Sequence, residues 1–170
     1  LSGIKKSNIY DKDEILLFDI NQNTKEKYLN LGFTFANSEK DLFNNIEIAI
    51  IAIKPQMFNE LRKVDYSNLN LVIISIAAGK TINDLKNIFG KQKYIRVMPN
   101  TPALIMSSAS AITRSIDVDD ETFDKVKEIF LSIGEVKEID ENLMNEIIPV
   151  NGSMPAYLYY FAKIFIEEAV

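Results

Sequence analysis

The 170-residue sequence contains neither cysteine nor histidine. These absences exclude disulfide bonds, thiolate nucleophiles, Ser-His-Asp triads, haem ligation by histidine and nearly every zinc site. We therefore expect no bound metal ion. A chain without cysteine fits a reducing compartment, so the expected location is the cytoplasm. Many secreted chains also lack cysteine, which leaves a secreted protein as the alternative.

The sequence also has no excess of basic residues and no long apolar run. Its formal net charge is -5 and its pI is near 4.9, with Lys and Arg scattered among Asp and Glu. Nucleic-acid binding needs a clustered basic surface, which argues against such a partner. The longest apolar runs, residues 48–53 and 156–162, are well below the roughly 18 residues that span a membrane. We expect neither a nucleic-acid partner nor a membrane segment.

What is present is the composition of a globular protein. Hydrophobic residues make up 47% and charged residues 25% of the chain, which excludes disordered, collagen-like and coiled-coil classes. The length suits one domain, or one and a fraction. The chain starts without Met, and Leu1-Ser2-Gly3 is typical of a helix that ends at a glycine. We expect the chain to begin inside a longer protein.

From Glu14 onward, short apolar runs alternate with amphipathic segments, which indicates βαβ units and a parallel sheet. Helices are expected between the strands; Ser38 and Thr81 are expected N-caps, and Gly32, Gly90 and Gly134 are expected helix ends. The sixth strand is a candidate for an antiparallel direction. The expected strands are residues 15–18, 33–35, 46–53, 71–76, 94–98, 107–113 and 135–139.

The character of the chain changes near residue 150. Residues 151–155 (Asn-Gly-Ser-Met-Pro) are typical of a turn with a serine N-cap. The helix from Ala156 is apolar almost all round, a pattern typical of burial, and the preceding residues alone cannot cover it. We therefore expect residues 1–150 to form one domain and residues 151–170 to begin a helical or dimerisation domain.

In a doubly wound sheet, ligands lie across the carboxyl ends of the strands. Asp19 is placed to accept from ribose hydroxyls, with a plain turn aspartate as the alternative. Lys54-Pro55 forms a rigid turn after a buried strand, with a purely structural turn as the alternative. Ala77-Ala78-Gly79 permits close backbone approach, with strand-to-helix packing as the alternative, and Asn37 could be a plain capping residue.

Residues 96–103 (Arg-Val-Met-Pro-Asn-Thr-Pro-Ala) form the most distinctive segment. Pro99 and Pro102 fix φ twice within four residues, which holds the Asn100 amide and the Thr101 hydroxyl in a stiff loop at a strand end. Such a loop suits ligand positioning, although a purely structural turn is the alternative.

Four segments, in this order, closely resemble the pyrroline-5-carboxylate reductase family: residues 52–56 (Ala-Ile-Lys-Pro-Gln), 74–79 (Ile-Ser-Ile-Ala-Ala-Gly), 96–103, and 152–157 (Gly-Ser-Met-Pro-Ala-Tyr). The resemblance implies a Rossmann-like, doubly wound, mostly parallel α/β domain and a helical C-terminal domain that builds a homodimer or higher homo-oligomer. It implies reduction of a small cyclic imine to proline with NADPH or NADH.

The resemblance also implies site residues. It gives no catalytic side chain within this chain, and the family's first strand, Gly-x-Gly-x-x-Gly turn and substrate-carboxylate loop have no counterpart here, so the fragment itself is expected to be inactive. The family usually has glycine where Met154 stands. Implied substrate contacts are Glu141, Gly152 and Ser153; implied cofactor contacts are Asp19, Asn37, Ala52, Ile53, Lys54, Pro55, Ile76, Ala77, Ala78, Pro99 and Asn100.

Several alternatives remain open from the sequence. Glu141 could instead be a charge at a helix N-terminus. Asp19 favours NADH, because a carboxylate repels a 2′-phosphate, whereas Lys25 and Lys27 on the next helix could reach a phosphate. The alternative functions are a β-hydroxyacid-type dehydrogenase, although Lys163 lacks that family's surrounding pattern, and a non-catalytic nucleotide-binding module.

Overall fold

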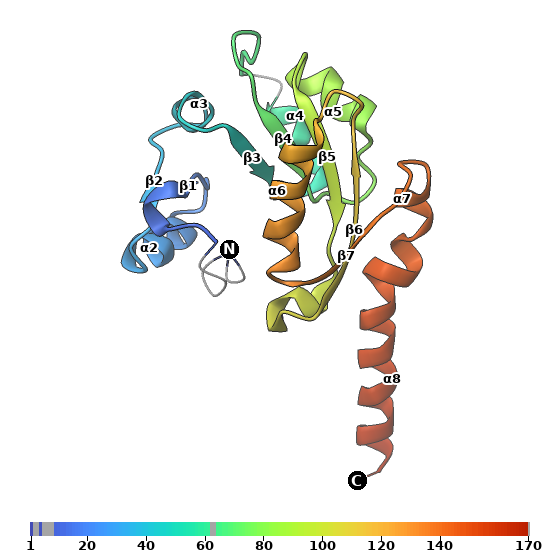
Figure 1. Ribbon diagram of the computed structural model, residues 1–170. Coiled ribbons are helices and arrows are strands. Elements are labelled where there is room, and N and C mark those ends of the chain that lie inside the picture. Colours follow the sequence, from blue (N-terminus) through green and yellow to red (C-terminus); the bar gives the residue numbers. More distant parts are fainter. Residues whose placement is uncertain (2–3, 5–8, 62–63, 170) are drawn as a thin grey trace.

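The computed structural model describes residues 1, 4, 9–61 and 64–169. The helix end expected at Gly3 lies outside the described residues. Figure 1 shows an α/β body from which one long helix, α8, projects at the C-terminal end.

The main sheet has five strands in the order β3-β4-β5-β6-β7. The first three are parallel to one another, β6 is antiparallel to β5, and β7 is parallel to β6. The expected mostly parallel sheet is confirmed, and the sixth strand, whose direction the sequence left open, is antiparallel. The bounds are β3 Ile48–Ile51, β4 Val72–Ser75, β5 Lys93–Met98, β6 Ser108–Arg114 and β7 Gly134–Glu138.

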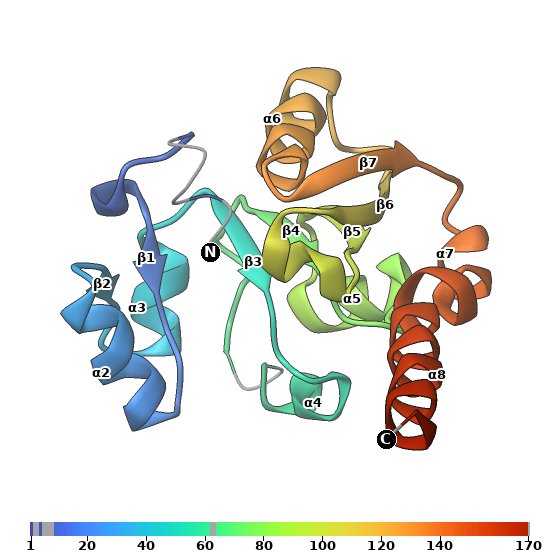
Figure 2. The ribbon, with the colours of Figure 1, turned by 90° about the horizontal axis from the view of Figure 1, so that it is seen from below.

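A second, two-stranded sheet is formed by β1 (Leu16–Leu17) and β2 (Thr34–Phe35), which run parallel. Within the described residues, β1 pairs only with β2 and β3 pairs only with β4, so each presents an unpaired edge. In Figure 2, β1 lies between β2 and β3. Helices α2 (Gln22–Asn30) and α3 (Glu39–Asn44) accompany this sheet.

Both faces of the main sheet are covered, as the doubly wound expectation requires (Figure 2). Helices α4 (Phe58–Leu61) and α5 (Ile82–Phe89) pack on one face, where Phe43, Tyr66 and Phe89 form an aromatic cluster. Helix α6 (Asp120–Leu131) packs its buried Phe123, Val126 and Ile129 on the other face. Each of these two hydrophobic clusters buries the side chains, many of them β-branched, on one face of the main sheet.

Local sequence signals set the helix starts as predicted. The Ser38 hydroxyl accepts from the Asp41 amide at 3.1 Å, and Thr81 and Asp84 form a reciprocal capping box at the start of α5. The hydrogen bonds that Thr81 donates hold the pKa of the Asp84 carboxyl below its ordinary value. Gly90 ends α5 with a φ of 72°.

The C-terminal segment differs from the predicted turn. Helix α7 (Leu143–Glu146) continues through a π-helical segment, Ile148–Ser153, into α8 (Met154–Glu168). Ser153 precedes α8, but its side chain makes no capping hydrogen bond, so the predicted serine N-cap is wrong. The physical reason is that the chain is already helical there, since the Asn151 amide donates to the Ile147 carbonyl at 2.7 Å.

Helix α8 is largely exposed in this single chain. None of its described residues is buried, and Phe161, Phe165 and Ile166 remain 58%, 73% and 67% exposed. The preceding residues therefore leave it uncovered, as expected. No helix within the described ranges combines the length and the apolar character needed to cross a membrane.

Candidate functional site

The carboxyl ends of β3, β4 and β5 meet at one edge of the main sheet, because these neighbouring strands are parallel. After β3 the chain runs through Ala52, Ile53 and Lys54 into a short 3-10 helix at Pro55–Met57. Three of the predicted cofactor segments therefore lie at one edge. Their members are Ala52, Ile53, Lys54, Pro55, Ile76, Ala77, Ala78, Pro99 and Asn100.

The loop after β4 leaves its backbone accessible. Ala77 is buried and its amide donates to the Ser75 hydroxyl at 3.3 Å, whereas Ala78 and Gly79 are exposed. Gly79 has a φ of +73°, and a Cβ built on it meets nothing within 4 Å. The open space beside Gly79 would let a flat ligand approach this part of the backbone closely.

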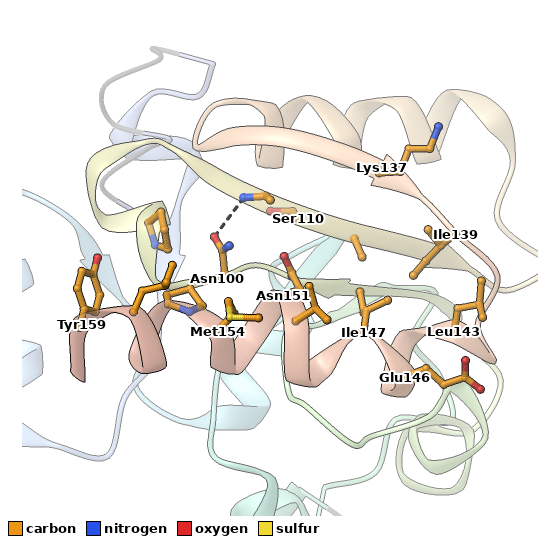
Figure 3. Close-up of a pocket in the computed structure, with 16 residues that line it drawn as sticks. Asn100, Ser110, Lys137, Ile139, Leu143, Glu146, Ile147, Asn151, Met154 and Tyr159 are labelled. Carbon is orange, nitrogen blue, oxygen red and sulfur yellow. Dashed lines mark hydrogen bonds between the residues drawn. The ribbon is translucent and has the colours of Figure 1, made fainter. Parts of the chain in front are cut away.

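The Pro99–Pro102 loop is fixed to β6 by Asn100. Its side-chain oxygen accepts from the Ala109 amide at 3.1 Å, as drawn in Figure 3, and its backbone amide donates to the Ser108 hydroxyl at 3.3 Å. Ser108 and Ser110, both buried, pair through their hydroxyls at 3.0 Å. The stiff loop expected from the prolines is present, and Asn100 has a structural task within it.

A pocket of about 870 Å³ lies between β6–β7 and the α7–α8 segment. Figure 3 labels Asn100, in the loop after β5, and Met154, at the start of α8, among the residues that line it. Its lining is mainly apolar, with Ile139, Leu143 and Leu158 among the residues that contribute. Met154, which stands where the resembling family usually has glycine, therefore lines the same pocket as Asn100.

Residues 151–153 are brought to the end of β5. The Asn151 side-chain amide donates to the Met98 carbonyl at 2.8 Å, across 53 residues of sequence. Gly152 and Ser153, predicted to contact the substrate, follow directly and are partly buried. The last motif of the resemblance thus lies beside the Pro99–Asn100 motif.

Glu141 is engaged by the protein itself. Its Oε1 accepts from the Ile82 amide at 2.6 Å and lies 3.2 Å from Arg96 Nη1. Ile82 is the first residue of α5, so the carboxylate lies at the partially positive N-terminus of that helix rather than of its own. The predicted contact between Glu141 and a ligand stays a prediction.

Asp19 and Asn37 lie in the other sheet, after β1 and β2. Asp19 Oδ1 accepts from the Asn21 amide at 2.8 Å, and the Asn37 amide and side chain donate to Asp41 Oδ2 at 2.8 and 3.1 Å. Both residues therefore have the local turn or cap role that the sequence allowed. Their predicted contacts with the adenosine ribose stay predictions.

Sequence reasoning did not assign three residues that organise this region: Arg96, Asn145 and Asn151. Arg96 is only 2% exposed, in the middle of β5, and its Nη2 donates to Asn145 Oδ1 at 3.1 Å. An arginine inside the apolar run Tyr94–Met98 was the available signal, because a buried charge requires partners. The two asparagines carry no comparable signal. Among the described residues, no group of three or more acidic side chains is placed to hold a metal ion.

Sequence comparisons show that the chain is similar to pyrroline-5-carboxylate reductases. The chain is 27% identical to the one from Pisum sativum over 170 residues, covering 99% of this chain and 62% of that protein. It is 34% identical to the one from Aquifex aeolicus over 153 residues, covering 88% and 57% of the two chains. The chain thus spans about 60% of the length of these curated relatives. No family model matches it.

Solved structures give the same result. The 1-pyrroline-5-carboxylate reductase from Streptococcus pyogenes superimposes with a TM-score of 0.86 at 29% identity, covering 99% of this chain and 67% of that one. The Plasmodium falciparum pyrroline carboxylate reductase with NADP bound gives 0.85 at 26% identity, covering 98% and 62%. The resemblance to the pyrroline-5-carboxylate reductase family is therefore confirmed along nearly the whole chain, and so is the Rossmann-type α/β fold.

Proposed function

We propose that this chain supplies the cofactor-binding edge and the interdomain connection of an NAD(P)H-dependent pyrroline-5-carboxylate reductase, which reduces the C=N bond of 1-pyrroline-5-carboxylate to give L-proline. The observation that carries this proposal is the meeting of the 52–55, 76–78 and 99–100 segments at one sheet edge, beside residues 151–153. The similarity of sequence and structure over nearly the whole chain supports it.

The residues at this edge fit a dinucleotide. In the proposed arrangement, residues 1–150 are the NAD(P)-binding part, with the nicotinamide against Lys54-Pro55, Ala77-Ala78 and Pro99-Asn100, and the adenosine ribose near Asp19 and Asn37. The open space over Gly79 supports close approach to the backbone. The unpaired edges of β1 and β3 support a sheet in which a further strand lies between them. NADP bound to the Plasmodium falciparum structure supports the choice of cofactor class.

The proposed reaction requires little acid-base catalysis by these residues. NAD(P)H supplies the hydride, and the protein contributes orientation and exclusion of water. Gly152 and Ser153, held beside β5 by Asn151, are proposed to face the imine, together with Glu141 in direct contact or acting through its neighbours. We assign no general base, in keeping with a chain that has no histidine.

A β-hydroxyacid-type dehydrogenase is disfavoured by the surroundings of Lys163. Its ammonium lies 3.5 Å from Glu167 on the surface of α8, and both side chains are more than half exposed. A catalytic lysine would be expected to face the cofactor edge. Residues 151–170 are proposed instead to begin a helical dimerisation domain, in which α8 packs against another copy in a homodimer or larger homo-oligomer. We further propose a cytoplasmic protein without nucleic-acid or membrane partners.

Kinetics of the full product of the gene that encodes this chain test the proposal. It should oxidise NADH or NADPH only when pyrroline-5-carboxylate is added, with proline as the product. Asn100→Ala should lower kcat/KM about ten-fold or more. Asn100→Asp keeps an acceptor for the Ala109 amide but loses the side-chain donor, so it separates loop anchoring from ligand contact.

Asn87→Ala is the matched control, because Asn87 is exposed in the last turns of α5, eight residues beyond Gly79. Loss of activity in Asn100→Asp with an unchanged melting temperature supports a ligand contact. Wild-type kinetics for both Asn100 variants, with substrate and cofactor each varied, would reject a functional role for this side chain.

A further inference from the structure

Arg96 connects the sheet to the segment that leads into α8. Its side chain is 2% exposed, and burying a guanidinium is costly unless partners compensate for lost hydration. Two partners lie on one short stretch: Glu141 Oε1 at 3.2 Å from Nη1 and Asn145 Oδ1 at 3.1 Å from Nη2. Glu141 lies in the turn before α7 and Asn145 lies within α7, and both contact the same guanidinium.

Glu141 extends the connection to a third element. The same Oε1 accepts from the amide of Ile82 at 2.6 Å, at the start of α5. This helix begins where the chain leaves the Ala77–Gly79 loop. The carboxylate therefore joins β5, α5 and the α7 segment, and it meets positive charge on two sides: the guanidinium and the N-terminal end of the α5 dipole.

A second attachment lies along the same strand. Met98, two residues after Arg96 in β5, accepts from Asn151 at 2.8 Å, and the buried Met144 packs against Met98 and Ala111. The stretch 141–151 is thus held to β5 at both ends. Gly152 and Ser153 follow the second attachment with no intervening loop.

We propose that Arg96, Glu141 and Asn145 form a clamp that sets the position of Gly152-Ser153 relative to the Asn100 loop, and that Glu141 is a positioning residue rather than a ligand contact. The inference rests on the proposed function, because the geometry that it controls is the alignment of hydride donor and imine. Small misplacements at such a site can lower the rate strongly while binding persists.

The test compares variants of the full gene product. Glu141→Ala should lower kcat about ten-fold or more, while KM for the imine and Kd for NAD(P)H change less than about two-fold. Glu141→Gln, which keeps an acceptor for Ile82 or Arg96, should recover part of that loss. Asp140→Asn removes a neighbouring exposed carboxylate and should leave the kinetics unchanged.

Asn145→Ala should also lower kcat. The double variant with Glu141→Ala should show a smaller fold-decrease in kcat than the product of the two single decreases, because both residues act through Arg96. A direct ligand contact predicts the opposite pattern: a raised KM for the imine in Glu141→Ala and wild-type kinetics in Asn145→Ala. That pattern would overturn the inference.

Amide hydrogen exchange provides a readout that is independent of activity. The Ile82 amide should exchange faster in Glu141→Ala than in wild type or Asp140→Asn, because Glu141 is its acceptor. Unchanged exchange at Ile82 would contradict the clamp. If the gene product reduces no imine at all, the proposed function fails, while the exchange experiment still decides whether the clamp exists.

Discussion

Asp19 has an observed role in a turn and a predicted role in cofactor binding. Its Oδ1 accepts from the Asn21 amide at 2.8 Å, and Asn21 in turn caps α2 through the Thr24 amide at 3.1 Å. This bond fixes the side-chain direction, while Asp19 stays exposed at the end of β1. An acidic residue at this place accepts from a ribose 2′-hydroxyl and repels a 2′-phosphate.

Asp19→Ser is therefore expected to shift the ratio of kcat/KM values from NADH toward NADPH. Repulsion on the order of 1 kcal/mol at a partly solvated site corresponds to a change of about five-fold in that ratio. Asp13→Asn, also exposed, is the charge-matched control. Two results would contradict a role of Asp19 in cofactor choice: a wild-type enzyme that strongly prefers NADPH, or a ratio that is unchanged in Asp19→Ser. Asp19 would then have only its role in the turn.

At the scale of the element, the start of β7 depends on glycine. Gly134 pairs with Ser108 at a φ of +146°, and a Cβ placed there would overlap the Ser108 carbonyl oxygen. Gly134→Ala is expected to lower the free energy of unfolding by about 3 kcal/mol or more, because strain and a backbone clash add. Urea unfolding of wild type and Gly134→Ala measures the difference in the free energy of unfolding.

Gly152→Ala is the matched control for that substitution. Its added Cβ would meet only Ile148 Cγ2, at 3.8 Å, which is ordinary contact. Stability should remain within about 0.5 kcal/mol of wild type, while a methyl group at the predicted substrate position should lower kcat/KM for the imine. Equal destabilisation by the two substitutions would contradict this account of β7.

The capping box of α5 gives a pH-dependent prediction. The pKa of Asp84 is lowered in the folded protein by hydrogen bonds from Thr81. A lowered folded-state pKa stabilises the protein above the unfolded-state pKa, near 3.9, and this stabilisation is lost as the pH falls through the folded-state value. Asp84→Asn should therefore be less stable than wild type at pH 7, and the difference should shrink below about pH 4. A constant difference across that range would refute the assignment.

The sequence predicts the elements whose signals are local, and it misses those set by distant partners. The caps at Ser38 and Thr81 and the end of α5 at Gly90 follow from short-range patterns. The π-helical entry to α8 was missed, because the Asn151 side chain bonds to Met98, far away in sequence. The partners of Glu141 were missed for the same reason.

At the scale of the whole molecule, α8 projects from the body with its apolar side chains uncovered (Figure 1). Its exposed aromatic residues are Tyr157, Tyr159, Tyr160, Phe161 and Phe165. Apolar surfaces of this kind mark interfaces. The full gene product is expected to be at least a dimer in sedimentation velocity at micromolar concentration, and Phe161→Asp should shift it toward monomer. A stable wild-type monomer would contradict the proposed role of α8.

The most direct test of the central claim follows a labelled hydride. The full gene product is incubated with pyrroline-5-carboxylate and NADH or NADPH that carries deuterium at C4 of the nicotinamide, and the proline is analysed by mass spectrometry and NMR. The account predicts one deuterium on the ring carbon that is bonded to nitrogen and carries no carboxylate, in L-proline, when the transferred face is labelled. Consumption of cofactor without deuterium at that carbon, or no proline with either cofactor, would contradict it.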